Sequence, residues 1–321
     1  MTKPNPLIDL FEAAHKAEGD KFVYDHYGDV RHIHRQRPLV RSIIDLNGDL
    51  LPNIESNDGM GLKRPPVGRP AVEVTKIGAE VIKQSLVAQA GAEVVIYKDP
   101  TEAISTGVLG DVVLARKSAY FETFEAAPFA LVLDGQEVGV TPLPIKRAQI
   151  HVDAAGGPQT GTAIYGLRFE FDRATLKNYP NFENAIMHAI TQGLARTADA
   201  VLLSAIVTAA PAPFSLSAAA AAAVRFGELR ALVGTTAAGA AVGQDGVLRA
   251  AGIAAEMTPD MAATIVGTFA RSAIMIRSEV DVIAERVKLP PDPMAGGVAF
   301  TAWAAMQPLL PDTSRFWTVG A

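Results

Sequence analysis

The chain has 321 residues, a net charge of −5 and no cysteine. Its length is enough for one large or two ordinary domains, and 49% hydrophobic against 20% charged residues favours a sizeable core over global disorder. The missing cysteines exclude disulfides and thiolate metal sites, and the acidic balance argues against a protein that coats nucleic acid by charge.

The first segment, residues 1–70, is dense in prolines and turn formers and has few apolar positions for a core of its own. It begins without the apolar stretch of a signal peptide, so we expect synthesis in the cytoplasm. Because the sequence starts at Met1 with this segment, we also expect that no N-terminal propeptide has been removed. The run RHIHRQR places His32 and His34 two residues apart, where they would share one face of a strand and could bind zinc or iron. The alternative is a basic arm that contacts phosphate or the acidic surface of a neighbouring subunit.

Strand signals dominate the next hundred residues. They cover residues 71–84 (AVEVTKIGAEVIKQ), 91–100 and 105–171. The turn formers Asp134–Gly135 indicate a hairpin turn within the last of these ranges. Just before that turn, Phe121, Phe124 and Phe129 lie close together in sequence. They form either an ordinary core or an exposed apolar patch that meets a neighbour.

The segment NFENAIMHAITQGLARTADAVLLSAIVTAA, residues 181–210, repeats apolar residues at steps of three and four. This is the stripe of an amphipathic helix, roughly 45 Å long at about 1.5 Å per residue. Charged residues along it are costly in hydrocarbon, which argues against a membrane span. We therefore predict a half-buried strut. Its polar face is expected to carry Asn184, His188, Gln192, Arg196 and Asp199.

The remainder of the chain mixes helix and strand signals. A second helix is predicted over residues 214–233, where a serine can cap a run of alanines. The Gly- and Ala-rich stretch that follows predicts loops and a short helix. Residues 262–287 predict two strands around a turn near Gly267–Arg271. Residues 296–321 predict a strand, a proline-bounded loop and a short last strand, with Trp303 and Trp317 as packing residues.

Sequence motifs for catalysis are missing. No phosphate-binding glycine loop, metalloprotease helix, calcium loop or nucleophile elbow occurs in the sequence. His151 and His188 have no sequence partner that would make them catalytic. We therefore expect no catalytic, cofactor-binding or metal-binding residue and no enzymatic activity. A metal-dependent cytoplasmic enzyme that uses His32 and His34 stays open as the alternative of a different class.

The order of segments is more informative than any motif. A strand, TAIYGLRFEF, leads into the long helix; an alanine-rich segment, GTFARSAIMIRSEVDVIAERV and GGVAFTAWAAMQPLLPDTSRFWTVG follow. Over roughly residues 105–321 this order resembles the major capsid proteins of tailed bacteriophages (Caudoviricetes), the Hong Kong ninety-seven fold family. The resemblance implies an α+β fold with an N-terminal arm, an extended β-hairpin (E-loop), a long spine helix with a peripheral β-sheet, and an axial domain.

The same resemblance implies a division of the chain. The expected parts are an N-terminal arm at 1–70, the start of the peripheral domain at 71–117, the E-loop at 118–152, the peripheral domain at 153–213 with spine helix 181–210, the axial domain at 214–262, and return strands of both domains at 263–321. Some family members crosslink a lysine to an asparagine between subunits. Lys146 lies near the presumed hairpin, but the sequence offers no match to the other two groups of that chemistry.

The implied function is structural. Copies of such a protein self-assemble into hexamers and pentamers of an icosahedral virion shell that encloses phage double-stranded DNA, after synthesis in the host bacterial cytoplasm. Implied partners are other copies, a separate scaffolding protein, a portal and a decoration protein, with weak non-specific contact to DNA and no membrane or cofactor. An encapsulin-like bacterial compartment shell protein is the alternative within the same fold.

Overall fold

The computed structural model describes residues 23–24, 30–31, 76–98, 101–105, 112–116, 119–125, 127–133, 136, 138–142, 144–151, 162–172, 182–287 and 297–320. The chain divides into two compact units, Met1–Val67 and Gly68–Ala321. In the first unit, β1 (Val23–Tyr24) pairs antiparallel with β2 (Val30–Arg31). The rest of the predicted arm, including His32 and His34, lies outside the described residues.

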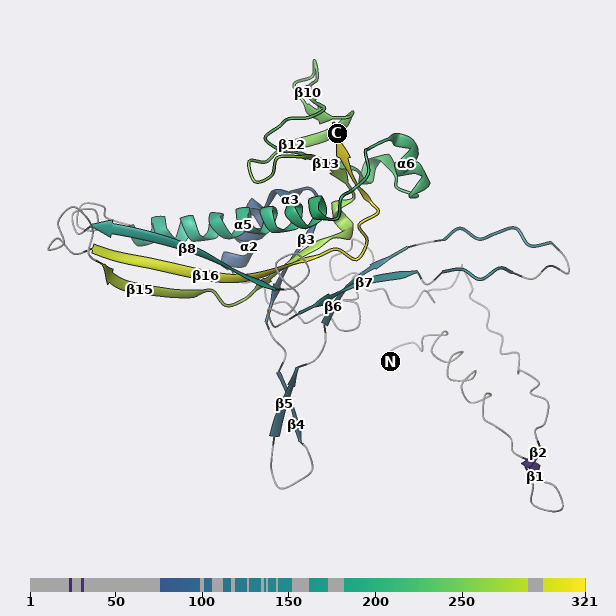
Figure 1. The fold of residues 1–321 in the computed structure, drawn as a ribbon, viewed down its shortest axis with the longest axis horizontal. Coiled ribbons are helices and arrows are strands. Elements are labelled where there is room, and N and C mark those ends of the chain that lie inside the picture. Colours follow the sequence, from purple (N-terminus) through teal and green to yellow (C-terminus); the bar gives the residue numbers. More distant parts are fainter. Residues whose placement is uncertain are drawn as a thin grey trace, which may run out of the picture. The chain divides into compact units, whose positions relative to one another are not determined.

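The second unit is mixed α+β, which confirms the predicted fold class (Figure 1). In its first sheet the paired strands follow the order β15-β16-β14-β3. A fifth strand, β8, also pairs with β16. The strands are β3 (Glu93–Tyr97), β8 (Ala163–Asp172), β14 (Ala273–Arg277), β15 (Asp281–Val287) and β16 (Gly297–Leu309). β16 runs antiparallel to β8, β14 and β15, whereas β14 and β3 are parallel. The long β16 is therefore the central strand of this sheet.

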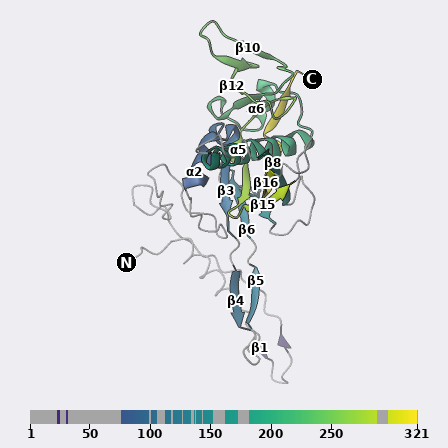
Figure 2. The same cartoon turned by 90° about the vertical axis from the view of Figure 1, so that its left-hand side faces the viewer.

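The predicted long helix is confirmed as α5 (Phe182–Thr208), 27 residues in one run. Its apolar stripe lies on the first sheet, where Ala198 and Val201 belong to one core with Ile274 and Met306. Farther along, Leu202 and Ile206 enter a second core together with strands of the other sheet. Figure 2 shows α5 lying between the two sheets.

The strand predicted at residues 71–84 is wrong where the structure describes it. Residues Lys76–Gln84 form helix α2, and α3 (Leu86–Gln89) follows directly. Valines and isoleucines favour strands only weakly, so tertiary packing can override them. Here Val81 is buried in the same core as the α5 residue Ala198, and a helix is what brings this face onto α5.

The second sheet has six strands in the order β10-β11-β12-β9-β13-β17. They are β9 (Arg230–Val233), β10 (Ala240–Val242), β11 (Leu248–Ala250), β12 (Ile253–Met257), β13 (Thr264–Gly267) and β17 (Phe316–Val319). Helix α6 (Leu216–Ala221), capped by Ser215 as expected, packs on this sheet through Ala219. The predicted helix over 214–233 is therefore wrong beyond Ala221, and β10 replaces the short helix expected after it.

The turn predicted near Gly267–Arg271 is present as a 3-10 helix, η2 (Phe269–Arg271). The two strands around it, β13 and β14, do not pair with each other but belong to different sheets. A third strand, β15, follows within the range for which two strands were predicted. The segment therefore carries the chain from the second sheet to the first.

The turn between β11 and β12 gives a prediction about stability. Ala251 has a φ of 49° and Gly252 a φ of 81°, so both residues are left-handed, as in a type I′ hairpin turn. Alanine is strained there, whereas Asn-Gly is the favoured pair. We expect Ala251→Asn to raise the free energy of unfolding by about 0.5–1 kcal/mol in urea titrations. Ala254→Asn, on the neighbouring strand, is the control that should bring no gain; equal effects would contradict this reading of the turn.

Candidate assembly interface

A two-stranded hairpin is anchored on the first sheet. Its strands β6 (Ala119–Phe124) and β7 (Ile145–Ile150) pair antiparallel, with Phe121 opposite Ala148. Phe121 and Ile150 are buried in one core with Met275 of β14. Because the neighbouring Ile274 faces the α5 core, alternation along β14 puts the hairpin on the opposite face of the sheet from α5.

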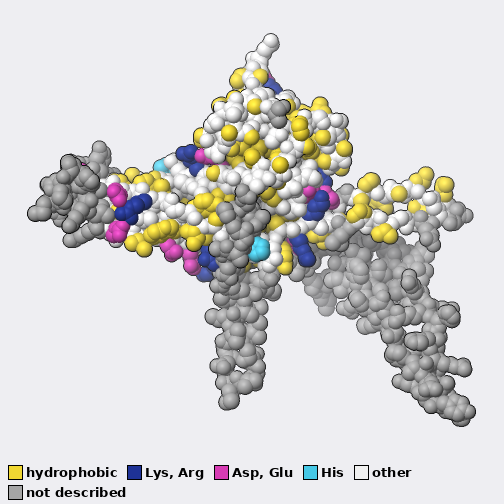
Figure 3. Space-filling view, in the orientation of Figure 1, with side chains coloured by type: hydrophobic (Ala, Val, Ile, Leu, Met, Phe, Trp, Pro, Cys, Tyr) yellow, Lys and Arg dark blue, Asp and Glu magenta, His cyan; other side chains and the backbone are white. Residues whose placement is uncertain are grey.

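Beyond these strands the described residues of the hairpin are not covered by any other described part of the chain. We call its described residues 127–133, 136 and 138–142 the hairpin tip, and all of them are exposed. A backbone hydrogen bond of 3.0 Å joins Gln136 N to Leu133 O. The predicted turn residues between them, Asp134 and Gly135, lie outside the described residues. Phe129, Leu131 and Val140 are 105%, 86% and 100% exposed. Figure 3 shows hydrophobic side chains gathered along the projecting hairpin.

The phenylalanine cluster is split between a core position and exposed positions, and contact of the exposed ones with a neighbour stays a prediction. Phe121 is buried in the anchor, and Phe129 is an exposed apolar side chain. Phe124, at the end of β6, is more than half exposed. Monomeric proteins rarely display large contiguous apolar patches in water, so the hairpin tip is a candidate interaction surface.

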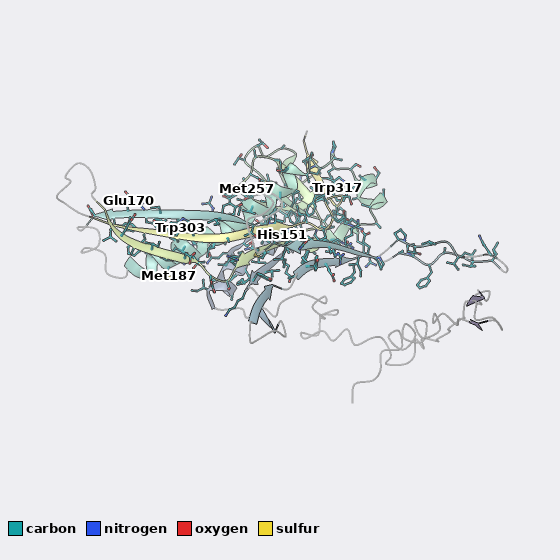
Figure 4. All side chains as sticks on the ribbon, turned by 60° about the horizontal axis from the view of Figure 1, so that its bottom comes forward. His151, Glu170, Met187, Met257, Trp303 and Trp317 are labelled. Carbon is teal, nitrogen blue, oxygen red and sulfur yellow. The ribbon has the colours of Figure 1, made fainter. Side chains whose placement is uncertain are left out.

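A buried glutamine also fastens β7 to the first sheet. Gln307 of β16 accepts a 2.8 Å hydrogen bond from the backbone N of His151 and donates one of 2.9 Å to the carbonyl of Gln149. Thr162 donates to the carbonyl of His151 beside it. Figure 4 shows His151 at the end of β7. The structure thus gives His151 a backbone role, and its ring has no nucleophile partner among the described contacts.

Charged side chains surround the point where the hairpin leaves the sheet. We call them the root cluster: Glu125, Lys146, Arg271, Asp312 and Arg315. Lys146 Nζ lies 2.7 Å from Asp312 Oδ2 and 3.5 Å from Glu125 Oε1. The side chains of Asp312 and Arg315 are only 7% and 8% exposed, so the centre of the cluster is shielded from solvent.

Arg315 is the hub of the root cluster. Its guanidinium donates to Glu125 on the hairpin, to Asp312 Oδ2 at 3.2 Å, and to the carbonyl of Ala222 at 2.6 Å. Arg271 Nη1 adds a 3.3 Å hydrogen bond to the carbonyl of Phe124. The cluster therefore joins both hairpin strands to η2, to the loop before β17 and to the turn after α6.

Asp312 is expected to make subunit stability depend on acid pH. Burial alone would raise the pKa of Asp312, but hydrogen bonds from Lys146 and Ser314 outweigh burial and lower the pKa to about 2. The pKa of nearby Glu125 is also lowered, chiefly by its hydrogen bond from Arg315. The carboxylate of Asp312 thus contributes stability above about pH 4 that is lost as pH falls through about 2, an effect of about 2 kcal/mol.

Urea unfolding of the wild type and of Asp312→Asn at several pH values checks this expectation. The difference between the two proteins should be largest near neutral pH and should shrink toward about pH 2. A difference that stays the same over that range would contradict it.

Among the described side chains of the predicted polar face of α5, Asp199 is the one that is misplaced; the side chain of Asn184 lies outside the described residues. Asp199, expected on the solvent face, is 1% exposed. Its Oδ1 accepts hydrogen bonds from Ser85 Oγ (2.6 Å) and Val87 N (3.1 Å), and its Oδ2 accepts one from Leu86 N (2.9 Å). Burial raises the pKa of Asp199, and these three bonds oppose that rise. The carboxylate of Asp199 thus accepts hydrogen bonds from the first backbone N–H groups of α3, and its role is to stabilise the N-terminus of that helix.

The remaining candidates from the sequence are explained by ordinary contacts. His188 lies 3.0 Å from Gln192 on the exposed side of α5. Lys146 is engaged in the root cluster. Trp317 is buried in the core of the second sheet, and the Trp303 ring packs over Gly166, so both are packing residues as predicted (Figure 4).

The described residues form no arrangement typical of a metal site or an active site. Within the described part of the chain, no group of three or more His, Asp or Glu side chains is placed to hold a metal ion. A small cavity of about 100 Å³ lies between α5 and the β8–β16 pair, lined in part by Tyr165, Ile190 and Trp303. Residues Ala185–Thr208 are long and apolar enough to cross a membrane. However, 56% of the 18-residue apolar stretch within them is buried inside the protein, as in a core helix.

Comparison with known proteins gives matches among solved structures alone. No protein-family model and no curated protein matches the sequence. The chain is similar in fold to "Capsid of empty GTA particle computed with C5 symmetry", at 14% identity over 74% of this chain and 90% of that one, with a TM-score of 0.42. A "Gordonia phage Cozz" chain matches at 14% identity over 74% and 86%, with a TM-score of 0.43.

A third match is a chain of "Satellite phage P4 procapsid including size determination (Sid) protein". Its identity is 13%, over 78% of this chain and 92% of that one, with a TM-score of 0.41.

Proposed function

We propose that this chain is a structural major capsid protein. Copies of it self-assemble into the hexamers and pentamers of an icosahedral virion shell that encloses phage double-stranded DNA. One observation carries the proposal: the hairpin tip presents Phe129, Leu131 and Val140 fully to solvent in the single chain. Such a surface fits a protein whose hairpin is covered by another copy.

The size of this surface suits a closed assembly. Burying one large apolar side chain stabilises a contact by about 1.5–3 kcal/mol. The hairpin tip offers five large apolar side chains that are each at least 65% exposed: Phe129, Leu131, Leu133, Val138 and Val140. In a symmetric shell each copy both gives and receives such a contact, so moderate contacts sum to a stable particle.

The body of the chain supports the same function. Helix α5 is 27 residues long, and its described side chains form no catalytic arrangement. Its buried carboxylate, Asp199, accepts hydrogen bonds from the start of α3. A long helix between two sheets stiffens a subunit whose contacts are made by projecting segments. A structural role with no enzymatic activity follows from this proposal.

The parts of the chain and its partners are proposed by the same reasoning. We assign the first sheet with α5 to a peripheral domain, the second sheet with α6 to an axial domain, residues 118–152 to the E-loop and residues 1–70 to an N-terminal arm. The proposed partners besides other copies are a scaffolding protein, a portal and a decoration protein. Contact with packaged DNA would be weak, in keeping with the net charge of −5.

Electron microscopy of the purified recombinant protein, together with light scattering, tests the proposal. Closed shells, or rings of five and six subunits, are the expected result. DNA inside particles from infected cells would complete it, whereas an enzyme cargo would redirect it to a bacterial compartment shell. A uniform monomer or dimer, with or without added scaffolding protein, would overturn the capsid assignment.

A further inference from the structure

The described part of the chain gives the hairpin tip no cover that could fix its direction. Every described residue of the tip is exposed. Its orientation must therefore be set where the hairpin leaves the body. Two features there hold both strands of the hairpin: the apolar anchor formed by Phe121 and Ile150, and the root cluster. The hydrogen bonds of Gln307 hold β7 alone.

These two features constrain the hairpin differently. Apolar contacts hold β6 and β7 against the sheet but are non-directional, so they leave the exit angle soft. Charge-assisted hydrogen bonds fix geometry, and the planar guanidinium of arginine does so most strongly because its donors form a rigid fork. Arg315 uses that fork on three separate segments, through Glu125, Asp312 and Ala222.

The root cluster also grips both strands of the hairpin. Glu125 follows β6 and Lys146 lies in β7, and Lys146 Nζ contacts both Glu125 and Asp312. At the same level, Glu125 N donates a 2.7 Å hydrogen bond to the carbonyl of Pro144. A rotation of the hairpin at its root would have to break several of these contacts together.

We propose that the root cluster, with Arg315 at its centre, fixes the direction in which the hairpin leaves the subunit and thereby the geometry with which copies join. Glu125 and Arg315 are positioning residues in this scheme. Because Arg315 also bonds to Ala222 in the turn after α6, a shift of the second sheet is transmitted to the hairpin. The consequence for assembly rests on the proposed function; the consequence for hairpin direction in the free subunit does not.

The absence of cysteine makes a direct measurement simple. Val138 on the hairpin tip and Ile77 on α2 are both exposed, so Val138→Cys and Ile77→Cys give two attachment sites for spin labels on an otherwise unreactive chain. Pulsed electron spin resonance then reports the distribution of distances between them. Dilution of labelled with unlabelled full-length protein keeps the measurement within one subunit, whether or not particles form.

Two variants and one control test the cluster. Glu125→Gln removes one charge at constant shape, and Arg315→Lys keeps the charge but removes the fork. Glu122→Gln, on the same strand, makes the same chemical change as Glu125→Gln outside the root cluster. We expect a single narrow distance peak in the wild type and in Glu122→Gln, and loss of that peak in the other two variants while the anchor stays folded.

A narrow peak retained in both Glu125→Gln and Arg315→Lys would overturn the proposal. Since Arg315 is more buried than Glu125, a variant of Arg315 that does not fold leaves Glu125→Gln to decide the question. Particle diameters seen by electron microscopy give the second readout. Shells of mixed size or open sheets are expected from the two root variants, and uniform shells from Glu122→Gln. If the wild type forms no particle at all, the capsid proposal fails, whereas the distance measurement still tests the root cluster.

Discussion

Asp199→Ala is expected to lower the free energy of unfolding of the free subunit by about 3 kcal/mol. The carboxylate is 1% exposed and accepts hydrogen bonds from Ser85, Leu86 and Val87. Removing it leaves two backbone N–H groups of α3 and one hydroxyl without that acceptor in a dry environment. Each unsatisfied buried donor costs about 1–3 kcal/mol, and relief from burying a charge offsets only part of the sum.

Urea unfolding followed by tryptophan fluorescence measures this loss. Asp260→Ala is the matched control, because Asp260 also pairs with α5, through Arg196 at 2.7 Å; the Asp260 side chain is 13% exposed, but the Arg196 side chain is 64% exposed. An ion pair whose arginine is open to solvent should contribute about 1 kcal/mol, well below the loss expected from Asp199→Ala. Equal losses in the two variants would show that the Asp199 carboxylate does not support α3. Asp199→Asn, which keeps the shape and one acceptor oxygen, should fall between the two.

The second large effect is expected on assembly rather than on folding. Phe129→Ser, Leu131→Ser and Val140→Ser, combined in one chain, should leave the free energy of unfolding of the free subunit within about 0.5 kcal/mol of the wild type. All three side chains are at least 86% exposed, so the subunit loses no core contact. If another copy covers them, each contact between copies loses about 5 kcal/mol, or more than a thousandfold in affinity.

Particle formation by the triple variant is the measurement, by light scattering and electron microscopy against wild type at equal concentration. Ile77→Ser, a polar substitution of an exposed apolar residue on α2, is the control and should assemble normally. Normal shells from the triple variant would mean that the hairpin tip is not the contact between copies. Loss of folding in the triple variant would mean that the tip packs within its own chain.

The elements that the sequence predicts best are those with long, regular patterns. Residues 181–210 predicted a helix that the structure bounds at Phe182–Thr208, because many apolar positions reinforce one period. The secondary structure of short segments was harder to predict, because tertiary packing decides it. The valines of residues 71–84 indicated a strand, and only the surface offered by α5 makes a helix there. The alanine run predicted helix to 233, but the chain turns after Ala221 and enters a sheet as β9.

Only part of the candidate interface could be predicted from the sequence. An exposed apolar patch among the phenylalanines was one of two open readings, since sequence spacing cannot tell Phe121 in a core from Phe129 in water. The root cluster could not be predicted, because Glu125 and Arg315 are 190 residues apart and Lys146 and Asp312 are 166 apart. Asp199 was misplaced because a helical wheel cannot show that α3 covers that face of α5.

The position of α5 has a consequence for the way the subunit unfolds. Ala198 and Val201 belong to the core of the first sheet, and Leu202 and Ile206, within the next two turns of the same helix, belong to the core beside the second. Neither core can open without freeing part of a helix that the other core needs. The two sheets should therefore melt in one cooperative transition, with equal calorimetric and van 't Hoff enthalpies. Amide hydrogens in the middle of α5 should exchange only through that global event, at the slow end of the chain's exchange rates.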